Sequence, residues 1–351
     1  MRKKINFGII GTGFIAPFHA EAISQATGFA RLVAVAGTNK STAGAFARKY
    51  GVKTVYSDYR KLLAQQLIDA VVICTPHSLH APMTLEAFES GKHVLVEKPM
   101  AVNLKEADKM IASSKEKNLK LAVGFQSRFN KYVIDLKKAL SEGKFGRIVT
   151  VSATLRWYRP ADYFLQKKWR GKSMTAGGGV LINQAIHLID LMQYFLGQPE
   201  SVFCMSETLT HDIEVEDVSA SILKFQNDSL GLIEATTSVR PKQAPSLVIC
   251  GGEGLAFLKF DTSKSWQTEI LLENKVNGED RQRKIIHQTT PMKEFISQIK
   301  DFVHTILKDK KPQVNGEEGR KSLEIVRALY CSSVTKRIVE FPFKENNQVS
   351  R

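Results

Sequence analysis

Short apolar runs alternate with helix-like segments throughout the first 125 residues of this chain. The apolar runs are INFGII, LVAVAG, DAVVICTP, HVLVEKP and KLAVGF. Between them lie segments with helical patterns, such as STAGAFARKYG and LHAPMTLEAFESGK. Alternation of this kind predicts a parallel sheet with helices on both faces. We therefore expect a doubly wound α/β domain over residues 1–124.

The pattern changes after Gly124, where strand-like stretches follow one another with few helices between them. These stretches are GRIVTVSATLRWY, SVFCMSETLT, DVSASILKFQ, SLGLIEATTSV, SLVICGG, LAFLKF and EILLEN. They predict a mainly antiparallel sheet, with hairpin turns at Gln226–Ser229 and Gly251–Gly254. Apolar spacing predicts helices at Lys131–Ser141, Val180–Leu196, Met292–Leu307 and Glu317–Arg337. We expect one α+β domain over residues 125–351.

Length and charge agree with two domains and argue against nucleic acid as a partner. The chain has 351 residues, more than the roughly 250–300 at which a single core stops growing. Its 50 Lys and Arg exceed its 35 Asp and Glu, for a net charge of +15. The basic residues are scattered and no window interleaves them with aromatic residues, so no nucleic-acid surface is expected. Either a solvated surface or a partly basic cleft for an anionic ligand explains the excess.

Neither the cysteines nor the apolar segments indicate a metal, disulfide or membrane function. Cys74, Cys204, Cys250 and Cys331 are far apart and form no C-x-x-C pair. The start, MRKKINFGIIGTGFIAP, imitates a signal peptide, but its glycines and polar residues favour a strand and a turn. The longest uncharged window, Ser173–Ile189, carries three glycines and several polar residues. We expect a cytoplasmic protein with no metal site and no membrane span.

A glycine-rich turn follows the first expected strand and precedes a helical segment. In GTGFIA, the residues Gly11, Gly13 and Ala16 match the pattern G-x-G-x-x-[GA]. Gly11 permits a tight turn, Gly13 lets a pyrophosphate approach the helix N-terminus, and Ala16 lets the helix pack closely. Such a turn can also be purely structural, but its place in a βαβ pattern favours dinucleotide binding. The expected contacts are Gly11, Thr12, Gly13, Phe14, Ile15 and Ala16.

The end of the second expected strand, VAVAGTNKS, bears on which dinucleotide is bound. An acid there would accept a hydrogen bond from the ribose 2′-hydroxyl of NAD, and none is present. Thr38, Asn39 and Lys40 occupy the place, and Lys40 or Arg48 could pair with a 2′-phosphate. The two basic residues are equally compatible with solvated helix positions. The sequence therefore favours NADP over NAD.

Three further segments carry a resemblance that covers nearly the whole chain. They are CTPHSLHAPMTLEAFESGK, HVLVEKPM and GGGVLINQAIHLIDLMQYFLG. Together with the glycine-rich turn, they resemble the glucose-fructose oxidoreductase, inositol dehydrogenase and MocA (Gfo/Idh/MocA) family. The resemblance implies an N-terminal Rossmann domain and a C-terminal domain with a large open sheet for substrate binding and oligomerisation. It also implies hydride transfer between NAD(P) and a secondary alcohol of a sugar or cyclitol, by a homodimer or homotetramer.

Acid–base chemistry at a secondary alcohol needs a residue that takes or gives the hydroxyl proton. Lys98, which follows a strand end, is our candidate, because burial beside a cationic nicotinamide would lower its pKa toward the useful range. Asn183 and His187 are four residues apart, so on a helix they share one face. The resembled family more often has Asp at the position of Asn183, and an amide cannot carry a proton. We expect Asn183 to position the substrate and His187 to bind the reacting hydroxyl, although a core histidine is the alternative.

Other candidates flank these residues. Thr75, Pro76, His77, His80, Glu97 and Gln126 are expected on the cofactor side, and Arg128 on the substrate side. Helix capping is the alternative for His77, His80, Gln126 and Arg128. The segment WYRPADYFLQKKWRGK combines aromatic rings with guanidinium groups that suit a sugar carrying a carboxylate or phosphate. From it we expect Arg156, Tyr163, Trp169 and Arg170 to bind substrate, with a domain-interface loop as the alternative.

Other functions stay open at this point. The substrate could be a sugar nucleotide or a uronic acid, oxidised by a 3-dehydrogenase. The resemblance also extends to glycosidases that retain NAD and to regulators that bind dinucleotide without catalysis. The missing acid at Asn183 permits the regulator, whereas Lys98 together with His187 argues against it.

Overall fold

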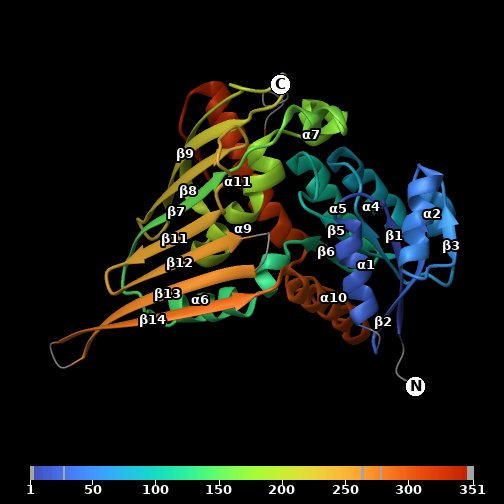
Figure 1. Ribbon diagram of the computed structural model, residues 1–351, viewed down its shortest axis with the longest axis horizontal. Helices are drawn as coiled ribbons and strands as arrows, with labels where there is room; N and C mark the ends of the chain where they lie inside the picture. The colour runs from blue at the N-terminus through green and yellow to red at the C-terminus, as the bar shows by residue number, and fades with distance from the viewer. Residues whose placement is uncertain (1–3, 27, 262–264, 277–278, 346–351) are drawn as a thin grey trace. The chain divides into compact units, whose positions relative to one another are not determined.

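The computed structural model describes residues 4–26, 28–261, 265–276 and 279–345 (Figure 1). The chain divides into two compact units. The first contains residues 1–129 and 292–320, and the second contains residues 130–291 and 321–351. From the sequence, the first domain was predicted to end at residue 124, and residues 125–351 were predicted to form the second domain. In the structure, the segment 292–320 returns to the first unit.

The first unit is built on a six-stranded sheet in the order β3-β2-β1-β4-β5-β6. Every neighbouring pair in this sheet is parallel, which confirms the predicted doubly wound architecture. The strands are β1 (Ile5–Ile10), β2 (Ala30–Ala36), β3 (Thr54–Tyr56), β4 (Ala70–Ile73), β5 (His93–Glu97) and β6 (Leu121–Gly124). The intervening helices are α1 (Ala16–Gln25), α2 (Lys40–Lys49), α3 (Tyr59–Leu63), α4 (His80–Glu89) and α5 (Leu104–Glu116), with 3₁₀ turns η1 (His77–Leu79) and η2 (Gln126–Phe129).

The central strand β4 is buried on both faces, so its sequence is continuously apolar rather than alternating. All four residues of β4, Ala-Val-Val-Ile, are buried. Helix α10 (Pro291–Lys308) completes the core of this unit, because its Phe295, Ile299 and Phe302 belong to the same apolar cluster as Phe7 of β1. The rings of Phe7 and Phe302 lie 6.2 Å apart between centroids. This packing explains why a segment so late in the sequence belongs to the first unit.

The second unit is built on a nine-stranded sheet in the order β14-β13-β12-β11-β7-β10-β9-β8-β15. Among its described strands, β7 and β10 pair in parallel and the other neighbours are antiparallel, as predicted for a mainly antiparallel sheet. The predicted turns at 226–229 and 251–254 join β9 to β10 and β11 to β12. The strands are β7 (Ile148–Arg156), β8 (Pro199–Glu207), β9 (Val218–Phe225), β10 (Leu230–Thr236), β11 (Ser246–Gly251), β12 (Gly254–Asp261), β13 (Ser265–Val276), β14 (Glu279–Thr289) and β15 (Val339–Glu340).

Helices cover one face of this sheet and leave the other face open (Figure 1). Helix α11 is held to β8 because Ser332 and Ser333 accept hydrogen bonds from the backbone N–H groups of Cys204 and Ser206, both at 3.0 Å. Burial alternates along β9, where Leu223 is buried and Ile222 is half exposed. The helical elements are α6 (Lys131–Ser141), α7 (Ala161–Leu165), η3 (Lys168–Gly171), α8 (Ser173–Ala176), a π-helical segment η4 (Leu181–Ala185), α9 (Ile186–Leu196) and α11 (Gly316–Thr335). None of the described helices combines the length and the apolar composition needed to cross a membrane.

Replacing Phe302 by alanine tests whether α10 is part of the first unit's core. The Phe302 ring is fully buried, so Phe302→Ala should lower the free energy of unfolding of this unit by about 3–5 kcal/mol. The measurement is hydrogen exchange of the β1 amides, which report on this unit alone. Leu307→Ala, in the same helix at a position 38% exposed, should cost under about 1 kcal/mol. Equal protection of β1 in both variants would contradict the assignment of α10.

Candidate functional site

The residues expected to contact the dinucleotide line up along one edge of the first unit's sheet. Because all six strands are parallel, their carboxyl ends meet at the same edge, where doubly wound sheets bind ligands. Glu97 and Lys98 lie at the end of β5, and Gln126 follows β6. The residues that follow β1, β2 and β4 at this edge are Gly11, Thr12, Gly13, Phe14, Ile15 and Ala16, then Thr38, Asn39 and Lys40, then Thr75, Pro76, His77 and His80.

The two glycines of the turn after β1 have different structural roles. Gly11 has φ +93°, and a Cβ atom there would lie 2.7 Å from the Cys74 carbonyl oxygen, so the fold requires glycine. Gly13 is exposed, and the nearest atom to a Cβ atom there is 3.9 Å away. Gly11 therefore shapes the turn, whereas Gly13 leaves open space in front of α1. A pyrophosphate fits that space, because the first backbone N–H groups of a helix attract anions.

Thr75 adds a buried hydroxyl group beside this turn. The strand order reverses between β1 and β4, and Thr75 follows β4 at this switch point. The Thr75 methyl group lies 3.1 Å from the position of a Cβ atom at Gly11. Its Oγ1 is buried and has no hydrogen-bond partner among the residues that the structure describes. A buried hydroxyl without a partner costs about 1–3 kcal/mol, so this position fits the polar groups of a bound dinucleotide.

The turn after β2 carries no carboxylate. A Cβ atom at Gly37 would lie 3.0 Å from Thr12 Oγ1, so this turn packs directly against the glycine-rich turn. Asn39 begins α2, and its Oδ1 accepts a hydrogen bond from the Thr42 N–H at 3.0 Å. Thr38, Asn39 and Lys40 are exposed. They can contact a ribose or its phosphate, as the sequence predicts. None of the three has a negatively charged side chain, so the contacts would come from neutral groups or from the Lys40 ammonium group.

Lys98 is held in place through its neighbours Glu97 and Pro99. Glu97 is buried, with Oε1 2.7 Å from Nε2 of the buried His19 on α1. The Lys98 N–H donates to Glu97 Oε2 at 3.2 Å. These contacts fix the backbone that presents Lys98 at the edge of the sheet. His19 carries no sequence signal, because a histidine one turn into a helix has no motif of its own.

His80 serves the protein backbone rather than a ligand. Its Nδ1 lies 2.7 Å from the Pro99 carbonyl oxygen and its Nε2 lies 2.9 Å from the Thr75 carbonyl oxygen. Burial lowers the pKa of His80, although both carbonyl groups favour the charged ring. With both nitrogens occupied, the expected cofactor contact of the ring is corrected to a link between the turns after β4 and β5. The neighbouring His77 ring is also buried, 5.8 Å from that of His80.

Arg128 does not fit the expected role in substrate binding. Its side chain is fully buried, and its Nη1 forms an ion pair with Glu318 Oε2 at 2.7 Å. Its carbonyl oxygen accepts a hydrogen bond from Gln313. Arg128 therefore ties η2 to the segment that begins α11 within the first unit.

In the second unit, the glycine run before α9 is required by close contacts. A Cβ atom at Gly178 would lie 2.1 Å from the Tyr330 hydroxyl, and one at Gly179 would lie 1.8 Å from the Glu216 carbonyl oxygen. The Glu216 carboxylate accepts hydrogen bonds from the N–H groups of Gly179 and Leu181 and from the Tyr330 hydroxyl, at 2.7–2.9 Å. Burial raises the pKa of Glu216 against the effect of these donors. Glu216 and Tyr330 thus fix the start of the helix that carries Asn183 and His187.

Asn183 and His187 lie on consecutive helical segments of different geometry. Asn183 is in the π-helical segment η4, and His187 is the second residue of α9. Both side chains are partly exposed. π-helical segments are rare and occur often at functional sites. Asp190, which the spacing put near the same stripe, is instead buried and accepts a hydrogen bond from Ser322 Oγ at 2.7 Å.

The arginines of the segment 156–170 differ in their partners. Arg156 forms a two-pronged ion pair with Glu234 through Nε and Nη2, at 2.6 and 2.5 Å, so its charge is neutralised on the sheet. This pairing argues against the expected substrate contact of Arg156. Arg170 stacks on Tyr163, with its Cζ 4.0 Å from the ring centroid, and lies 5.8 Å from the centroid of Trp169. Arg159, one of the guanidinium groups of this segment but not among its residues expected to bind substrate, also stacks on Tyr163, at 4.7 Å.

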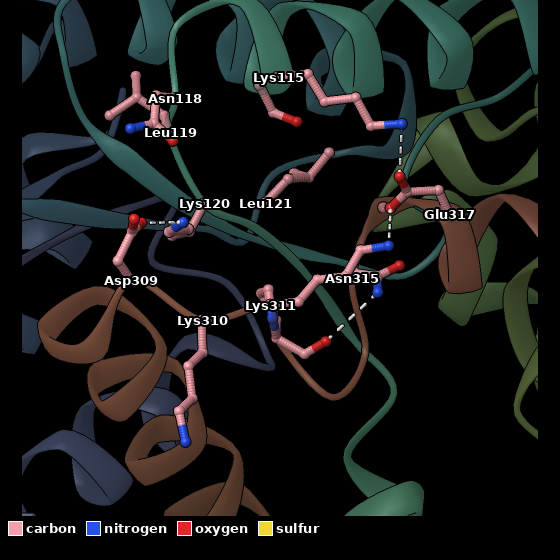
Figure 2. A pocket seen from close by; sticks show the side chains of 13 residues that line it. Lys115, Asn118, Leu119, Lys120, Leu121, Asp309, Lys310, Lys311, Asn315 and Glu317 are labelled. Carbon is pink, nitrogen blue, oxygen red and sulfur yellow. Dashed lines mark hydrogen bonds and ion pairs between the residues drawn. The ribbon is translucent and has the colours of Figure 1, made fainter.

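The first unit also contains a pocket of about 300 Å³, which lies away from the dinucleotide edge of the sheet (Figure 2). It is lined by the end of α5, the start of β6 and the segment 309–317. The start of β6 is the edge of the sheet opposite to the glycine-rich turn. Three of its lysines are paired: Lys120 with Asp309 at 2.5 Å, and Lys115 and Lys311 with Glu317 at 2.7 and 3.7 Å. The pocket therefore belongs neither to the dinucleotide edge nor to an open cationic site. Among the described residues, no cluster of His, Cys, Asp or Glu has the arrangement of a metal site.

Two family models match the chain, one over each part. The first, described as an oxidoreductase family with an NAD-binding Rossmann fold, matches residues 5–125. The second, the GFO/IDH/MocA C-terminal domain, matches residues 133–257. Together they account for most of the chain.

Curated and solved proteins are similar over nearly the full length. The myo-inositol 2-dehydrogenase of Thermotoga maritima is 25% identical over 344 residues, which are 96% of this chain and 98% of that protein. The WlbA dehydrogenase of Bordetella pertussis, solved with NADH and UDP-GlcNAcA, is 29% identical with a TM-score of 0.84. A levoglucosan dehydrogenase solved with NADH and levoglucosan is 25% identical with a TM-score of 0.89. Each of these two alignments covers 97% of this chain and 100% of the solved chain. The chain therefore belongs to the Gfo/Idh/MocA family of oxidoreductases.

Proposed function

We propose that this protein is a dehydrogenase that transfers hydride between NAD(H) and a secondary alcohol or ketone of a sugar, sugar derivative or cyclitol. The observation that carries the proposal is the edge of the first unit's sheet, where Lys98 follows β5 beside a glycine turn suited to a pyrophosphate. The relatives named above are an inositol dehydrogenase, a levoglucosan dehydrogenase and a dehydrogenase that was solved with UDP-GlcNAcA. None of these names supports a glycosidase or a non-catalytic regulator.

The roles of the side chains follow from their chemistry. Bound NAD(H) supplies or accepts the hydride. Lys98 Nζ takes the proton of the reacting hydroxyl during oxidation and returns it during reduction. His187 binds the same oxygen and assists this transfer, whereas Asn183 donates or accepts hydrogen bonds that orient the substrate. Glu97 and His80 act indirectly, because they hold the backbone on either side of Lys98.

We propose NAD(H) rather than NADP(H) as the physiological cofactor, which departs from the preference inferred from the sequence. The two solved relatives described above contain NADH, and the comparisons give no support to NADP. The absence of an acid after β2 removes one recognition element for NAD without supplying a site for a 2′-phosphate. Asn39 offers an amide there, which can hydrogen-bond a ribose hydroxyl.

Assembly and location stay predictions. We propose a homodimer or homotetramer that pairs through the open face of the nine-stranded sheet. Support comes from apolar residues that are 49–54% exposed on three adjacent strands: Met205, Ile222, Leu230 and Leu232. Light scattering of the purified protein tests the assembly. A cytoplasmic location, inferred from the sequence, awaits fractionation of cells.

Gly13→Leu should abolish dinucleotide binding without unfolding the protein. A Cβ atom fits at this position, so the expected loss of NADH affinity, about 100-fold or more, reflects the space that the pyrophosphate needs. The measurement is NADH fluorescence titration, with circular dichroism to check folding. Gly28→Leu is a matched control, because no atom lies within 4 Å of a Cβ atom there and the residue is in the loop after α1. Unchanged affinity in a folded Gly13→Leu protein would refute the turn as the phosphate site.

Cofactor choice can be measured as kcat/KM with NAD and NADP. We expect a preference for NAD of tenfold or more, about 1.4 kcal/mol. Asn39→Asp should widen this preference, since a carboxylate accepts from the ribose hydroxyl and repels a 2′-phosphate. A preference for NADP in the unaltered protein would restore the inference made from the sequence.

Lys98→Met keeps the length of the side chain and removes its proton donor. We expect kcat to fall by about 10²–10⁴, while NADH affinity changes less than a few-fold. Lys105→Met, at an exposed position of α5, is the control and should turn over normally. Near-normal turnover of Lys98→Met would mean that another group carries the proton.

The partners of Lys98 should respond differently to substitution. His187→Ala should lower kcat/KM because it removes a ligand of the reacting oxygen. Asn183→Asp should keep activity and shift the pH profile, since it adds a titratable group beside the reacting hydroxyl. A pH profile that is unchanged in Asn183→Asp would place this residue away from the substrate.

A further inference from the structure

Two arginines of the second unit share one aromatic ring. The Arg170 Cζ lies 4.0 Å and the Arg159 Cζ 4.7 Å from the centroid of the Tyr163 ring. Arg159 also lies 4.7 Å from the centroid of Trp157. We call Arg159, Tyr163 and Arg170 the arginine stack. Aromatic faces attract such cations by about 0.5–2 kcal/mol each, which holds them in place without neutralising them.

Within the part of the chain that the structure describes, no carboxylate balances the charge of this stack. No described carboxylate forms an ion pair with Arg159 or Arg170, in contrast to the pairing of Arg156 with Glu234. Arg170 Nη1 donates to the Tyr163 carbonyl oxygen at 3.1 Å. Arg159 Nε is buried and has no acceptor within the described part of the chain. Burial lowers the pKa of Arg159, and the charge of Arg170 acts in the same direction.

The hydrogen-bond network around the stack includes the carboxylate of Asp217, which bonds to groups other than the two arginines. Asp217 accepts from the N–H groups of Leu209, Thr210 and His211 and lies 2.8 Å from His211 Nδ1. Burial alone would raise the pKa of Asp217, but these bonds outweigh it and hold the pKa well below its usual range. Asp217 is therefore a fixed acceptor for its own loop and not a counter-ion for the stack.

The same network holds the stack in a defined position. His211 Nε2 lies 2.8 Å from the Arg159 carbonyl oxygen, so His211 links Asp217 to the backbone of Arg159. The ring of Phe164, next to Tyr163, lies 4.9 Å from the His211 ring. Fixing the backbone on both sides reduces the ordering cost that a ligand would otherwise meet.

The stack also touches the helical segment that carries Asn183. Gln184 Nε2 donates to the Tyr163 hydroxyl at 3.3 Å. Gln184 is buried and follows Asn183 directly within η4. One side chain therefore separates the arginine stack from the segment that we assign to substrate orientation.

We propose that Arg159 and Arg170 bind a carboxylate or phosphate group of the substrate, so that the enzyme acts on an anionic sugar derivative. The inference rests on the proposed dehydrogenase function and names its substrate class. A guanidinium group carries parallel N–H donors that match the oxygens of either anion, and a bound anion would supply the negative charge that the described residues do not place beside the stack. Arg159 thereby takes the substrate-binding role that was predicted for Arg156.

The test measures binding to the NADH-loaded protein by calorimetry, without requiring turnover. The probes are matched pairs: D-glucose with D-glucuronate, D-glucose with D-glucose 6-phosphate, and UDP-GlcNAc with UDP-GlcNAcA. We expect the anionic member of at least one pair to bind tenfold or more tightly. The first and third pairs report a carboxylate site, and the second reports a phosphate site. Arg159→Met and Arg170→Met should each lower the affinity for the preferred probe toward that of the pair member without the added carboxylate or phosphate group.

Controls separate a specific site from general attraction and from misfolding. Lys168→Met removes an exposed charge from the same loop and should leave the preference within twofold. Arg159→Lys keeps the charge and should retain only part of the affinity for the preferred anion, because a lysine ammonium group lacks the parallel N–H donors of a guanidinium group. Circular dichroism, which reports on both units, verifies that each variant is folded.

Equal binding of the two members in every pair would overturn the proposal, and so would a preference for the added anionic group that survives both arginine substitutions. Failure of every anionic probe to bind at 10 mM would also count against it. In either case, oxidation of a neutral polyol with reduction of NAD⁺ to NADH would leave the dehydrogenase function standing. Absence of turnover with specific anion binding would instead refute the function and keep the anion site.

Discussion

A buried hydrogen bond between His19 and Glu97 sets the geometry of the dinucleotide edge. His19 lies on the first turn of α1, directly after the glycine-rich turn, and Glu97 immediately precedes Lys98. The two side chains are 2.7 Å apart and almost inaccessible to solvent, so losing either partner would strand the other at a cost of about 1–3 kcal/mol. A Cβ atom at Gly124 would lie 2.9 Å from Glu97 Oε1, so β6 must end in glycine for the contact to exist. One interaction therefore connects the phosphate turn, the lysine and the neighbouring strand.

Much of the fold could be predicted because local sequence determines it. The run INFGII is β1 from end to end, and the predicted helix Lys131–Ser141 is α6, with Asn130 capping its first turn. Partners in the tertiary structure could not be predicted in the same way. An amphipathic pattern shows that α10 buries one face, but not that Phe7 and its neighbours receive it. Strand β14 was not predicted either, since EDRQRKIIHQT lacks the alternation of a half-buried strand.

The candidate site divides along the same line. Motifs with a local mechanism, such as the turn from Gly11 to Ala16 and the placement of Lys98 after β5, were readable from the sequence. The π-helical turn at Asn183 was not, because it starts from contacts with Glu216 and Tyr330, which are distant in the sequence. Charge balance was also invisible, since Arg156 and Arg159 look alike until Glu234 pairs with one of them. Contacts between residues distant in the sequence therefore determine which arginines of the segment 156–170 are available to bind a ligand.

The central claim is that this chain moves hydride between a nicotinamide and a carbohydrate carbon. Transfer of deuterium tests it most directly. The protein is incubated with NADH deuterated at C4 and a panel of keto sugars, keto cyclitols and their acids. The masses of the products are then measured by mass spectrometry. The account predicts that one substrate class gains a single deuterium at the new carbinol carbon, from one face of the nicotinamide. Tight binding of the labelled cofactor with no deuterium in any carbohydrate would contradict it and would indicate a dinucleotide-binding protein without redox chemistry.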